Sequence, residues 1–243
     1  MAISVDSVYQ RVLGILNKEQ RGYVTAQEFN LFANQAQEDL FEQYFYDINQ
    51  FGRIPGNSTE YSDMLNLLNE KINIFETVAQ PTRTGNFFDE PTDLYRLGTV
   101  VYKNTTTNPF GVSSTESIEA ERINANEFLY INSSPLTKPK NVRPVFVANT
   151  NGIRVYGNSE ITAVADVEFQ YIKKPAKVQW AYQIVFDEPL YNAVNSVNFE
   201  LHPSDETELV IKILELSGIL IKDLNLYQVM NQEEQETIQQ EKS

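Results

Sequence analysis

The sequence predicts an α+β fold in which N- and C-terminal helices pack as one bundle and an antiparallel, β-rich segment is inserted between them. Apolar residues recur with a period near 3.6 at both ends of the chain and with a period of 2 in the middle. The change of period coincides with a change of charge, because both ends are acidic and the middle is not. We therefore predict a helical domain of residues 1–80 and 187–243, with a C-terminal tail, and a small inserted domain of residues 81–186.

The composition argues against several classes of protein. Residues 1–95 contain 6 basic and 14 acidic side chains (net −8), residues 96–182 contain 10 and 7 (+3), and residues 183–243 contain 3 and 12 (−9). This acidity disfavours nucleic-acid binding through a basic face. The 243 residues include no cysteine, so disulfides and thiolate metal sites are excluded. We expect no secretion signal and no membrane span, since the start lacks a basic segment followed by an apolar core and no run of 18 apolar residues occurs.

A long helix is predicted over residues 25–51. Thr25 and Glu28 have the spacing of a capping box, in which each side chain satisfies a backbone N–H of the first turn. The apolar residues at helical spacing are Phe29, Phe32, Ala33, Ala36, Leu40, Tyr44, Ile48 and Phe51. At 1.5 Å per residue this helix is about 40 Å long. Because Phe41, Phe45 and Tyr46 widen the apolar stripe, we expect cover from other helices or from another subunit.

Two further N-terminal helices are predicted, over residues 5–16 and 58–79. The first places Val5, Val8, Val12, Ile15 and Leu16 on one face. The second carries Tyr61, Met64, Leu65, Leu68, Ile72, Phe75 and Ala79, and Pro81 ends it. Residues 81–91 have the composition of a linker.

The middle of the chain predicts a small antiparallel sheet. Strands are expected over residues 94–103 and 117–123, on either side of a polar loop at 104–115, and a short helix capped by Asn124 follows and ends near Pro135.

A β-hairpin is predicted where residues 145–150 and 153–156 flank Asn151-Gly152, since this dipeptide tolerates the positive φ angles of a type I′ turn. Residues 161–172 alternate as a strand, with Val167, Phe169 and Tyr171 among the residues of one face.

Helices are predicted again at the C-terminal end. Asp187 is expected to cap a helix over 189–201, and Ser204 a second helix that extends to Leu216. Residues 226–243 are rich in Gln and Glu with few apolar residues, which is typical of a disordered segment.

Two patterns resemble chemical sites but have simpler interpretations. Residues 17–28 fit part of an EF-hand loop, yet the ligand position 5 is Arg21, a cation. We interpret this segment as a turn followed by the capping box, without calcium. His202 is the only histidine and stands beside Ser204 and Asp205, which a helix start explains, whereas a catalytic triad is assembled from residues distant in sequence.

No other motif predicts a catalytic, cofactor or metal site. Neither a Walker loop nor a G-x-G-x-x-G pattern is present, and no pair of carboxylates is marked by spacing. Two basic clusters are interpreted as solvated loops in preference to a phosphate site; they are Lys138, Lys140 and Arg143, and Lys173, Lys174 and Lys177.

Two blocks of the chain resemble structural proteins of tailed bacteriophages. They are VYQRVLGILNKEQRGYVTAQEFNLFANQAQEDLFEQYFYDINQF (8–51) and FELHPSDETELVIKILELSGILIKDLNLYQVMNQEEQETIQQEKS (199–243), with YIKKPAKVQW (171–180) between them. Together they resemble the ring, or head-to-tail connector, proteins of crAss-like phages. The resemblance covers both helical ends closely and the middle loosely.

The resemblance implies a non-enzymatic virion protein, a subunit of a homo-oligomeric ring of commonly twelve copies at the junction of portal and tail, assembled in the host cytoplasm. The implied partners are further copies of the chain, the portal protein and adjacent ring or tail proteins. Genomic DNA would pass through the channel without specific binding, since an acidic wall makes no phosphate contacts. We predict interface residues in the long helix and in the tail; they are Phe41, Phe45, Tyr46, Leu226, Tyr227, Val229 and Met230.

Two other functions stay open at this point. The β-rich insertion could present a host- or carbohydrate-binding surface that includes the loop at 104–115, although such binders are mostly β and this chain is half helical. A hydrolase with carboxylates that the sequence does not mark is the third alternative.

Overall fold

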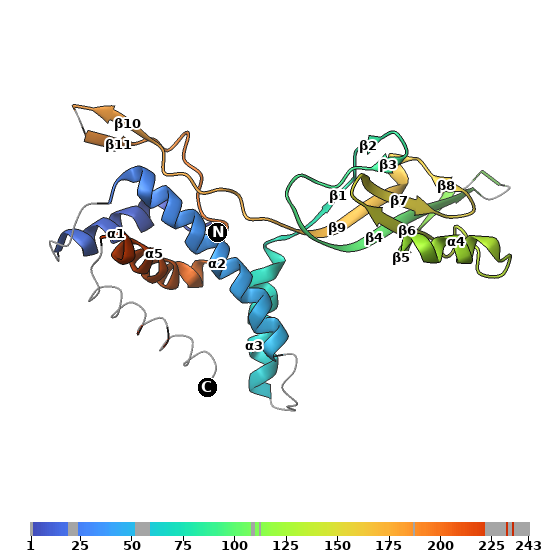
Figure 1. Ribbon diagram of the computed structural model, residues 1–243, viewed down its shortest axis with the longest axis horizontal. Coiled ribbons are helices and arrows are strands. Elements are labelled where there is room, and N and C mark those ends of the chain that lie inside the picture. The colour runs from blue at the N-terminus through green and yellow to red at the C-terminus, as the bar shows by residue number, and fades with distance from the viewer. Residues whose placement is uncertain are drawn as a thin grey trace. The chain divides into compact units, whose positions relative to one another are not determined.

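The computed structural model describes residues 2–18, 24–51, 59–107, 110–111, 113–186, 188–221 and the single residues 232 and 235. Within these residues the protein is a mixed α+β structure with five α-helices and a large sheet that is mostly antiparallel, which confirms the predicted class. The chain divides into a helical unit, Met1–Ile74 and Pro175–Ser243, and a β unit, Phe75–Lys174 (Figure 1).

Four helices belong to the helical unit: α1 (Val5–Lys18), α2 (Ala26–Phe51), α3 (Thr59–Asn73) and α5 (Glu206–Ile221). Helix α5 packs against α1 and α2, and α3 packs against α2. The predicted apolar stripes supply the core between them. Its fully buried members include Val5, Val8, Val12, Leu16, Phe29, Ala33, Ala36, Leu40, Leu209 and Ile213.

The predicted capping box starts α2. The backbone N–H of Thr25 donates to Oε2 of Glu28 at 2.8 Å, and the N–H of Glu28 donates to Oγ1 of Thr25 at 3.3 Å. The bond from the Thr25 N–H, followed by a bond that the Thr25 hydroxyl donates to the same carboxylate oxygen at 2.8 Å, lowers the pKa of Glu28. Because this pKa is lowered, the cap stabilises the fold at pH values above the pKa of an unfolded glutamate. The stabilisation is lost as the pH falls from there through the lower pKa of the folded state.

Two predictions near residue 80 are wrong. The third helix ends at Asn73, and Glu76–Ala79 forms strand β1, which pairs antiparallel with β9 (Val167–Lys173). The β-branched Thr77 and Val78 favour this extended pairing. The predicted linker contains β2 (Arg83–Thr84) and β3 (Phe87–Phe88), a short hairpin anchored by the buried ring of Phe88.

The predicted helix over 189–201 is also wrong. Its first part is strand β11 (Glu188–Tyr191), which pairs with β10 (Tyr182–Val185), and residues 193–195 form a turn. The apolar residues have helical spacing, but the backbone finds distant partners. Bridges join Val197 to Gln179 and Phe199 to Ile3. Tertiary pairing therefore overrides the local period.

The β unit is organised around one sheet of the order β1-β9-β4-β5-β6-β7-β3-β2, with β8 paired to β7. The remaining elements are β4 (Leu94–Thr107), β5 (Ser113–Arg122), α4 (Ala125–Ser133), β6 (Val145–Asn149), β7 (Gly152–Tyr156), β8 (Glu160–Ile161) and the 3-10 turn η1 (Val164–Asp166). Among the described strands, only β5 and β6 pair in parallel, because α4 makes the crossover between them. The short helix predicted after Asn124 is confirmed, but the side chain of Asn124 makes no capping hydrogen bond.

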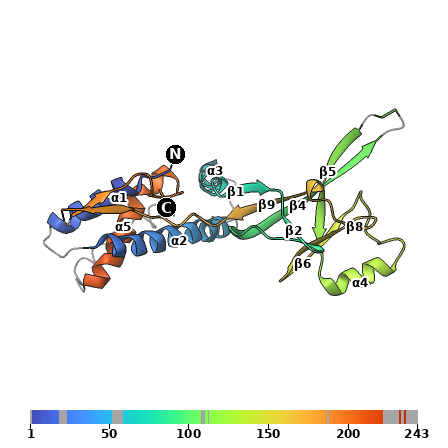
Figure 2. The ribbon, with the colours of Figure 1, turned by 90° about the horizontal axis from the view of Figure 1, so that it is seen from above.

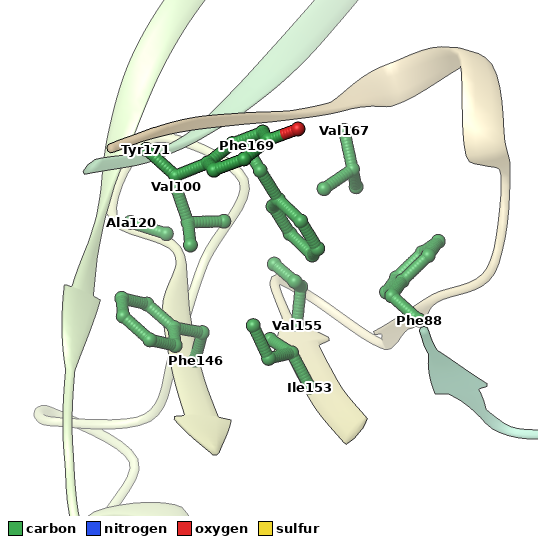
Figure 3. Close-up of a cluster of buried hydrophobic side chains, with 9 residues drawn as sticks. All are labelled: Phe88, Val100, Ala120, Phe146, Ile153, Val155, Val167, Phe169 and Tyr171. Atoms are coloured by element: carbon green, nitrogen blue, oxygen red, sulfur yellow. The ribbon is translucent and has the colours of Figure 1, made fainter. Parts of the chain in front are cut away.

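The core of the β unit consists of side chains from six strands (Figure 3). Its buried members are Phe88, Val100, Ala120, Phe146, Ile153, Val155, Val167, Phe169 and Tyr171. The three from β9 alternate along the strand, as the sequence predicts for this segment. The alternation does not extend to residue 161, where β8 and η1 replace the first half of the predicted strand.

The predicted loop at 104–115 is mostly strand. Strand β4 pairs with β9 as far as Tyr102, which lies opposite Val167. After Tyr102, among the described residues, β4 pairs only with β5, and these two strand ends form an arm (upper right in Figure 2). The hydroxyls of Thr105 and Thr115 lie 3.1 Å apart across it. A run of β-branched threonines favours strand over loop, and such cross-strand pairs stabilise it.

The hairpin of β6 and β7 is confirmed, but its turn differs from the prediction. Asn149 pairs with Gly152, so the two loop residues are Thr150 and Asn151. Glycine is required at 152 for another reason. Its φ is +124°, and a Cβ there would lie 2.5 Å from the carbonyl oxygen of Phe88. The close approach of β3, and not a type I′ turn, explains this glycine.

Tyr171 gives the β unit a pH dependence. Burial, followed by a hydrogen bond donated to Oδ1 of Asp93 at 2.9 Å, raises the pKa of its hydroxyl. An unfolded tyrosine titrates near pH 10. The contribution to stability is therefore complete below about pH 10 and is lost as the pH rises through the higher pKa of the folded state.

We expect Tyr171→Phe to lower the free energy of unfolding by about 1 kcal/mol at pH 8, the typical value of one hydrogen bond. Denaturant titrations followed by circular dichroism should show that the difference from the wild type shrinks above pH 10. Tyr130→Phe is the control, since this residue is exposed. A constant difference across the range would contradict the assignment.

Candidate interaction surface

The hairpin of β10 and β11 exposes apolar side chains on the helical unit (upper left in Figure 1). The side chain of Phe186 at its turn is 98% exposed, and Val194, just after β11, is 92% exposed. Ile184 on β10 and Leu190 on β11 are also exposed. They lie on opposite faces of the hairpin, because Leu190 pairs with Gln183 and Ile184 with Pro189. Several exposed apolar side chains on one small hairpin mark a candidate site of protein contact. The sequence signal was the β-branched and aromatic run Tyr182-Gln-Ile-Val-Phe, which the helical interpretation of 189–201 obscured.

The backbone at Phe186 is strained. Its φ is +52°, the one positive φ of a non-glycine residue in the described part of the chain. A bulky side chain in this left-handed region costs about 1–3 kcal/mol, and such strain is concentrated at functional positions. Asparagine or glycine would fit this backbone better.

Trp180 anchors the base of the hairpin. It is buried, and its indole N–H donates to Oδ1 of Asp6 on α1 at 3.0 Å. Its ring stacks with Tyr182 and Tyr191, one from each strand, at centroid distances of 5.7 and 5.8 Å. Tyr9 of α1 lies 4.1 Å from the same ring. The hairpin therefore projects from a fixed aromatic base.

Three side-chain amides of α2 hold the extended segment that leads to Trp180; we call them the amide ladder. Asn30 accepts from the N–H of Trp180 at 2.7 Å and donates to its carbonyl at 3.2 Å. Asn34 makes the same pair of bonds with Val178, both at 2.9 Å. Gln37 donates to the carbonyl of Ala176 at 2.8 Å.

The spacing of the amide ladder follows from helix and strand geometry. Four helical residues rise about 6 Å, which matches two residues of an extended chain. Asn30 and Asn34 are four apart on α2, and their partners are two apart. A polar stripe at 30, 34 and 37 on an otherwise apolar helix is the sequence signal that could have indicated this contact.

A second apolar surface lies on the β unit along residues 129–143; we call it the α4 surface. Its exposed apolar side chains are Leu129, Tyr130, Leu136 and Val142. Hydrogen bonds hold the loop after α4 against the end of the helix. Thr137 Oγ1 donates to the carbonyl of Ile131 at 3.1 Å, and the N–H of Lys138 donates to the carbonyl of Ser134 at 3.0 Å. On the inner side, Phe128 stacks on Tyr156 at 4.1 Å.

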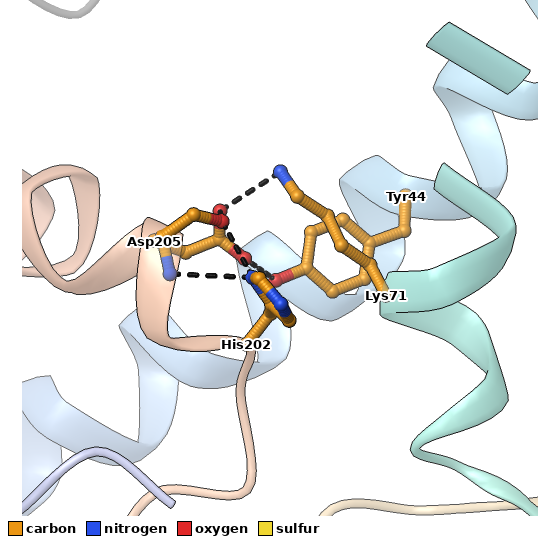
Figure 4. A network of polar contacts seen from close by, with 5 residues as sticks. Tyr44, Lys71, His202 and Asp205 are labelled. Carbon is orange, nitrogen blue, oxygen red and sulfur yellow. Dashed lines mark hydrogen bonds and ion pairs between the residues drawn. The ribbon is translucent and has the colours of Figure 1, made fainter. Parts of the chain in front are cut away.

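A buried polar network joins three helices (Figure 4). The carboxylate of Asp205, before α5, accepts from the hydroxyl of Tyr44 on α2 and pairs with Nζ of Lys71 on α3 at 2.8 Å. A depression of about 410 Å³ beside it is lined in part by Leu67, Leu68 and Ile211. The network is placed to hold α2, α3 and α5 together.

His202 and Ser204 form the start of α5. Nδ1 of His202 accepts from the N–H of Ser204 at 3.2 Å, and the hydroxyl of Ser204 donates to Asp205 at 2.9 Å. The side-chain cap is therefore His202 and not the predicted Ser204, because a 3-10 turn, Pro203–Asp205, precedes the α-helix. His202 and Ser204 also line the depression of about 410 Å³ beside Asp205.

The predicted interface residues fall in different places. Phe41 is buried and meets Phe45 edge-to-face at 5.0 Å, so its ring belongs to the core of its own unit and is not a surface anchor. Phe45 is half-buried, and Tyr46 is 60% exposed. Leu226, Tyr227, Val229 and Met230 lie outside the described residues.

In the part of the chain that the structure describes, no three His, Asp or Glu side chains come together in a metal-binding arrangement. None of the helices described has the length and apolar character of a membrane span. No family model matches the chain, and the search of curated proteins finds no match.

Proposed function

We propose that this protein is a non-enzymatic structural protein of a tailed-phage virion, a subunit of an oligomeric ring that joins the portal of the head to the tail. The observation that carries the proposal is the β10–β11 hairpin, which holds exposed apolar side chains such as Ile184, Phe186 and Leu190 on an anchored backbone. Assembly subunits need such preorganised contacts. The resemblance of blocks 8–51 and 199–243 to ring proteins of crAss-like phages supports the position in the virion.

The charge distribution suits a channel. The helical unit contains 9 basic and 22 acidic residues, a net charge of −13, whereas the β unit contains 10 and 11, a net charge of −1. A helical unit of this charge makes few phosphate contacts, so genomic DNA passes without being held. In this proposal α1, α2, α3 and α5 form one bundle made from both ends of the chain, and their mutual packing supports it.

The buried network of Asp205, Lys71 and Tyr44 supports a structural role. A catalytic carboxylate faces a substrate, but the two oxygens of Asp205 are used by Lys71, Tyr44 and Ser204 within the fold. The proposed partners are further copies of the chain, the portal protein and adjacent ring or tail proteins. In the C-terminal tail, Leu226, Tyr227, Val229 and Met230 remain proposed anchors on a neighbouring subunit or on the portal.

The test is the size of the assembled protein. Mass photometry and negative-stain electron microscopy of the purified chain, alone and with the portal of its phage, are expected to show closed rings, of twelve copies in the simplest case. A monomer under both conditions would overturn the proposal. A monomer that binds host cells or a glycan array through residues 75–174 would support a receptor-binding module instead.

A further inference from the structure

We propose that the arm formed by the ends of β4 and β5 pairs edge to edge with the arm of a second copy of the chain, so that β5 of one copy lies beside β4 of the next. The arm consists of residues 103–107 and 113–117 (Figure 2). This inference rests on the proposed function, because it names a contact between neighbouring subunits of the ring. A contact between two different edges of identical copies is heterologous, and it closes into a ring when the rotation between copies permits.

Both outer edges of the arm are open in the part of the chain that the structure describes. Strand β9 pairs with β4 only as far as Tyr102, and β6 pairs with β5 only at Glu121 and Arg122. Along the arm, β4 and β5 pair in a continuous register without a bulge, and neither segment contains proline. Natural proteins commonly block edge strands with bulges, proline or charge. A regular edge without bulge or proline is a template for a further strand.

The arm has no apolar core of its own. Every residue of 105–107 and 113–117 is exposed. Hydroxyl contacts cross the arm from Thr105 to Thr115 and from Thr107 to Ser113, both at 3.1 Å, but they bury no apolar surface. Two strands without a buried face are marginally stable in water, and additional strands stabilise them. The partner that fits these edges is therefore an extended strand.

The direction of the backbone groups can be followed from the base of the arm. The N–H of Glu121 donates to the carbonyl of Pro144 at 3.0 Å, on the side of β5 away from β4. Because backbone groups of successive residues point to alternate sides of a strand, the odd-numbered residues of β5 direct their N–H and C=O groups to this outer side. They are Ser113, Thr115, Ser117 and Glu119. Their partners within the arm direct theirs to the opposite edge; they are Thr107, Thr105 and Lys103.

The two edges of one arm complement each other. The register within the chain places Ser113, Thr115 and Ser117 opposite Thr107, Thr105 and Lys103. These pairs exchange no backbone bonds within the chain, because their polar groups point outward. When β5 of one copy lies beside β4 of the next in the same register, the same three pairs become hydrogen-bonded pairs with about two bonds each. A second copy of the arm therefore satisfies both edges.

Charge selects β4 as the neighbour of β5. Residues 113–119 contain Glu116 and Glu119 and no basic side chain, whereas 103–107 contain Lys103 and no acidic one. Two β5 edges therefore repel, and in their longest antiparallel register Glu116 lies opposite its own copy. A β4 edge beside a β5 edge is the one combination with opposite charges, which favour association. It brings Lys103, already paired with Glu168 in its own chain, diagonal to Glu119 of the next copy.

Disulfide formation tests the contact directly, because the native chain has no cysteine. We expect mild oxidation to join a Thr105→Cys chain to a Thr115→Cys chain when the two are mixed before assembly. The Cα atoms of a hydrogen-bonded pair are about 5.5 Å apart, which a disulfide spans. Either variant alone should give little dimer, since like edges are then about two strand spacings apart. A dimer from one variant alone, in a yield equal to that of the mixture, would overturn the inference.

The register has its own control on the same strand. Thr106 is exposed like Thr105, but its side chain lies on the other face of the arm. Thr106→Cys mixed with Thr115→Cys should therefore give little disulfide. An equal yield from this mixture would mean that the arms meet without a defined register, which contradicts strand pairing.

A proline variant tests whether assembly depends on the open edge. Thr115→Pro removes one outward N–H and leaves the backbone bonds between β4 and β5 in place. We expect about tenfold weaker self-association by mass photometry, with an unchanged melting temperature. Thr115→Ala is the matched control, because it removes the hydroxyl and keeps the N–H, and it should assemble like the wild type. Equal weakening in both variants would overturn the edge bonds as the cause.

The outcomes separate the two proposals. Normal rings without the disulfide between positions 105 and 115, together with normal assembly of Thr115→Pro, would overturn the arm contact and leave the ring proposal standing. A wild-type chain that forms no ring, alone or with the portal, overturns the proposed function itself. The disulfide in such a sample would still support the arm contact, which would then join copies in an open chain.

Discussion

Replacement of Asp205 by alanine is expected to lower the free energy of unfolding of the helical unit by about 3–5 kcal/mol, because removal of one partner of a buried ion pair leaves the other charge uncompensated. The side chain of Lys71 is 17% exposed, and its ammonium lies 2.8 Å from the lost carboxylate. The hydroxyl of Tyr44 loses its acceptor at the same time. Denaturant unfolding followed by circular dichroism measures the loss.

The control stands next to Asp205 in sequence. Glu206 pairs with Arg11 at 3.1 Å, but the two side chains are 28% and 56% exposed. Glu206→Gln should therefore cost no more than about 1 kcal/mol. The double variant Asp205→Ala with Lys71→Met should recover part of the loss, since it removes the orphaned charge. Equal losses for Asp205→Ala and Glu206→Gln would show that the network is not a buried one.

The second large effect is expected from the amide ladder. Asn34→Ala removes both bonds to Val178 and leaves a partly buried N–H and C=O without partners, at a cost of about 2–4 kcal/mol. Hydrogen exchange measured by mass spectrometry should become faster in residues 176–182, because this extended segment loses its hydrogen bonds to Asn34 on α2.

Asn49→Ala is the matched control, since Asn49 lies on α2 and donates to the carbonyl of Phe45 at 2.8 Å within the helix. It should leave the exchange of residues 176–182 unchanged. Equal acceleration in both variants would mean that α2 as a whole has been loosened, and the ladder would not be the cause.

Local signals in the sequence were sufficient for several elements. The capping box of Thr25 and Glu28 and the alternation of Val167, Phe169 and Tyr171 depend on neighbouring residues, and both are present as predicted. The segment 189–201 shows where such signals fail. Its apolar spacing is helical, but its backbone pairs with residues far away in the chain, such as Ile3.

The candidate surface was less predictable than the fold. In the sequence, Phe41 widens the apolar stripe of α2 and was therefore predicted as an interface residue. Whether such a stripe is covered depends on packing against helices from other parts of the chain. The apolar tip at Phe186 depends on the hairpin, and the hairpin depends on Trp180 reaching Asp6, 174 residues away. Long-range contacts of this kind leave little trace in a single sequence.

The amide ladder imposes an order of folding during synthesis. Asn30 and Trp180 are 150 residues apart in sequence, and the whole β unit is translated between them. A continuous unit can fold as it leaves the ribosome, but the helical unit must wait for its second part. Until then the amides of α2 are bonded to water, and the apolar face that later contacts α5 is uncovered. The β unit can therefore be complete while the helical unit still lacks its second part.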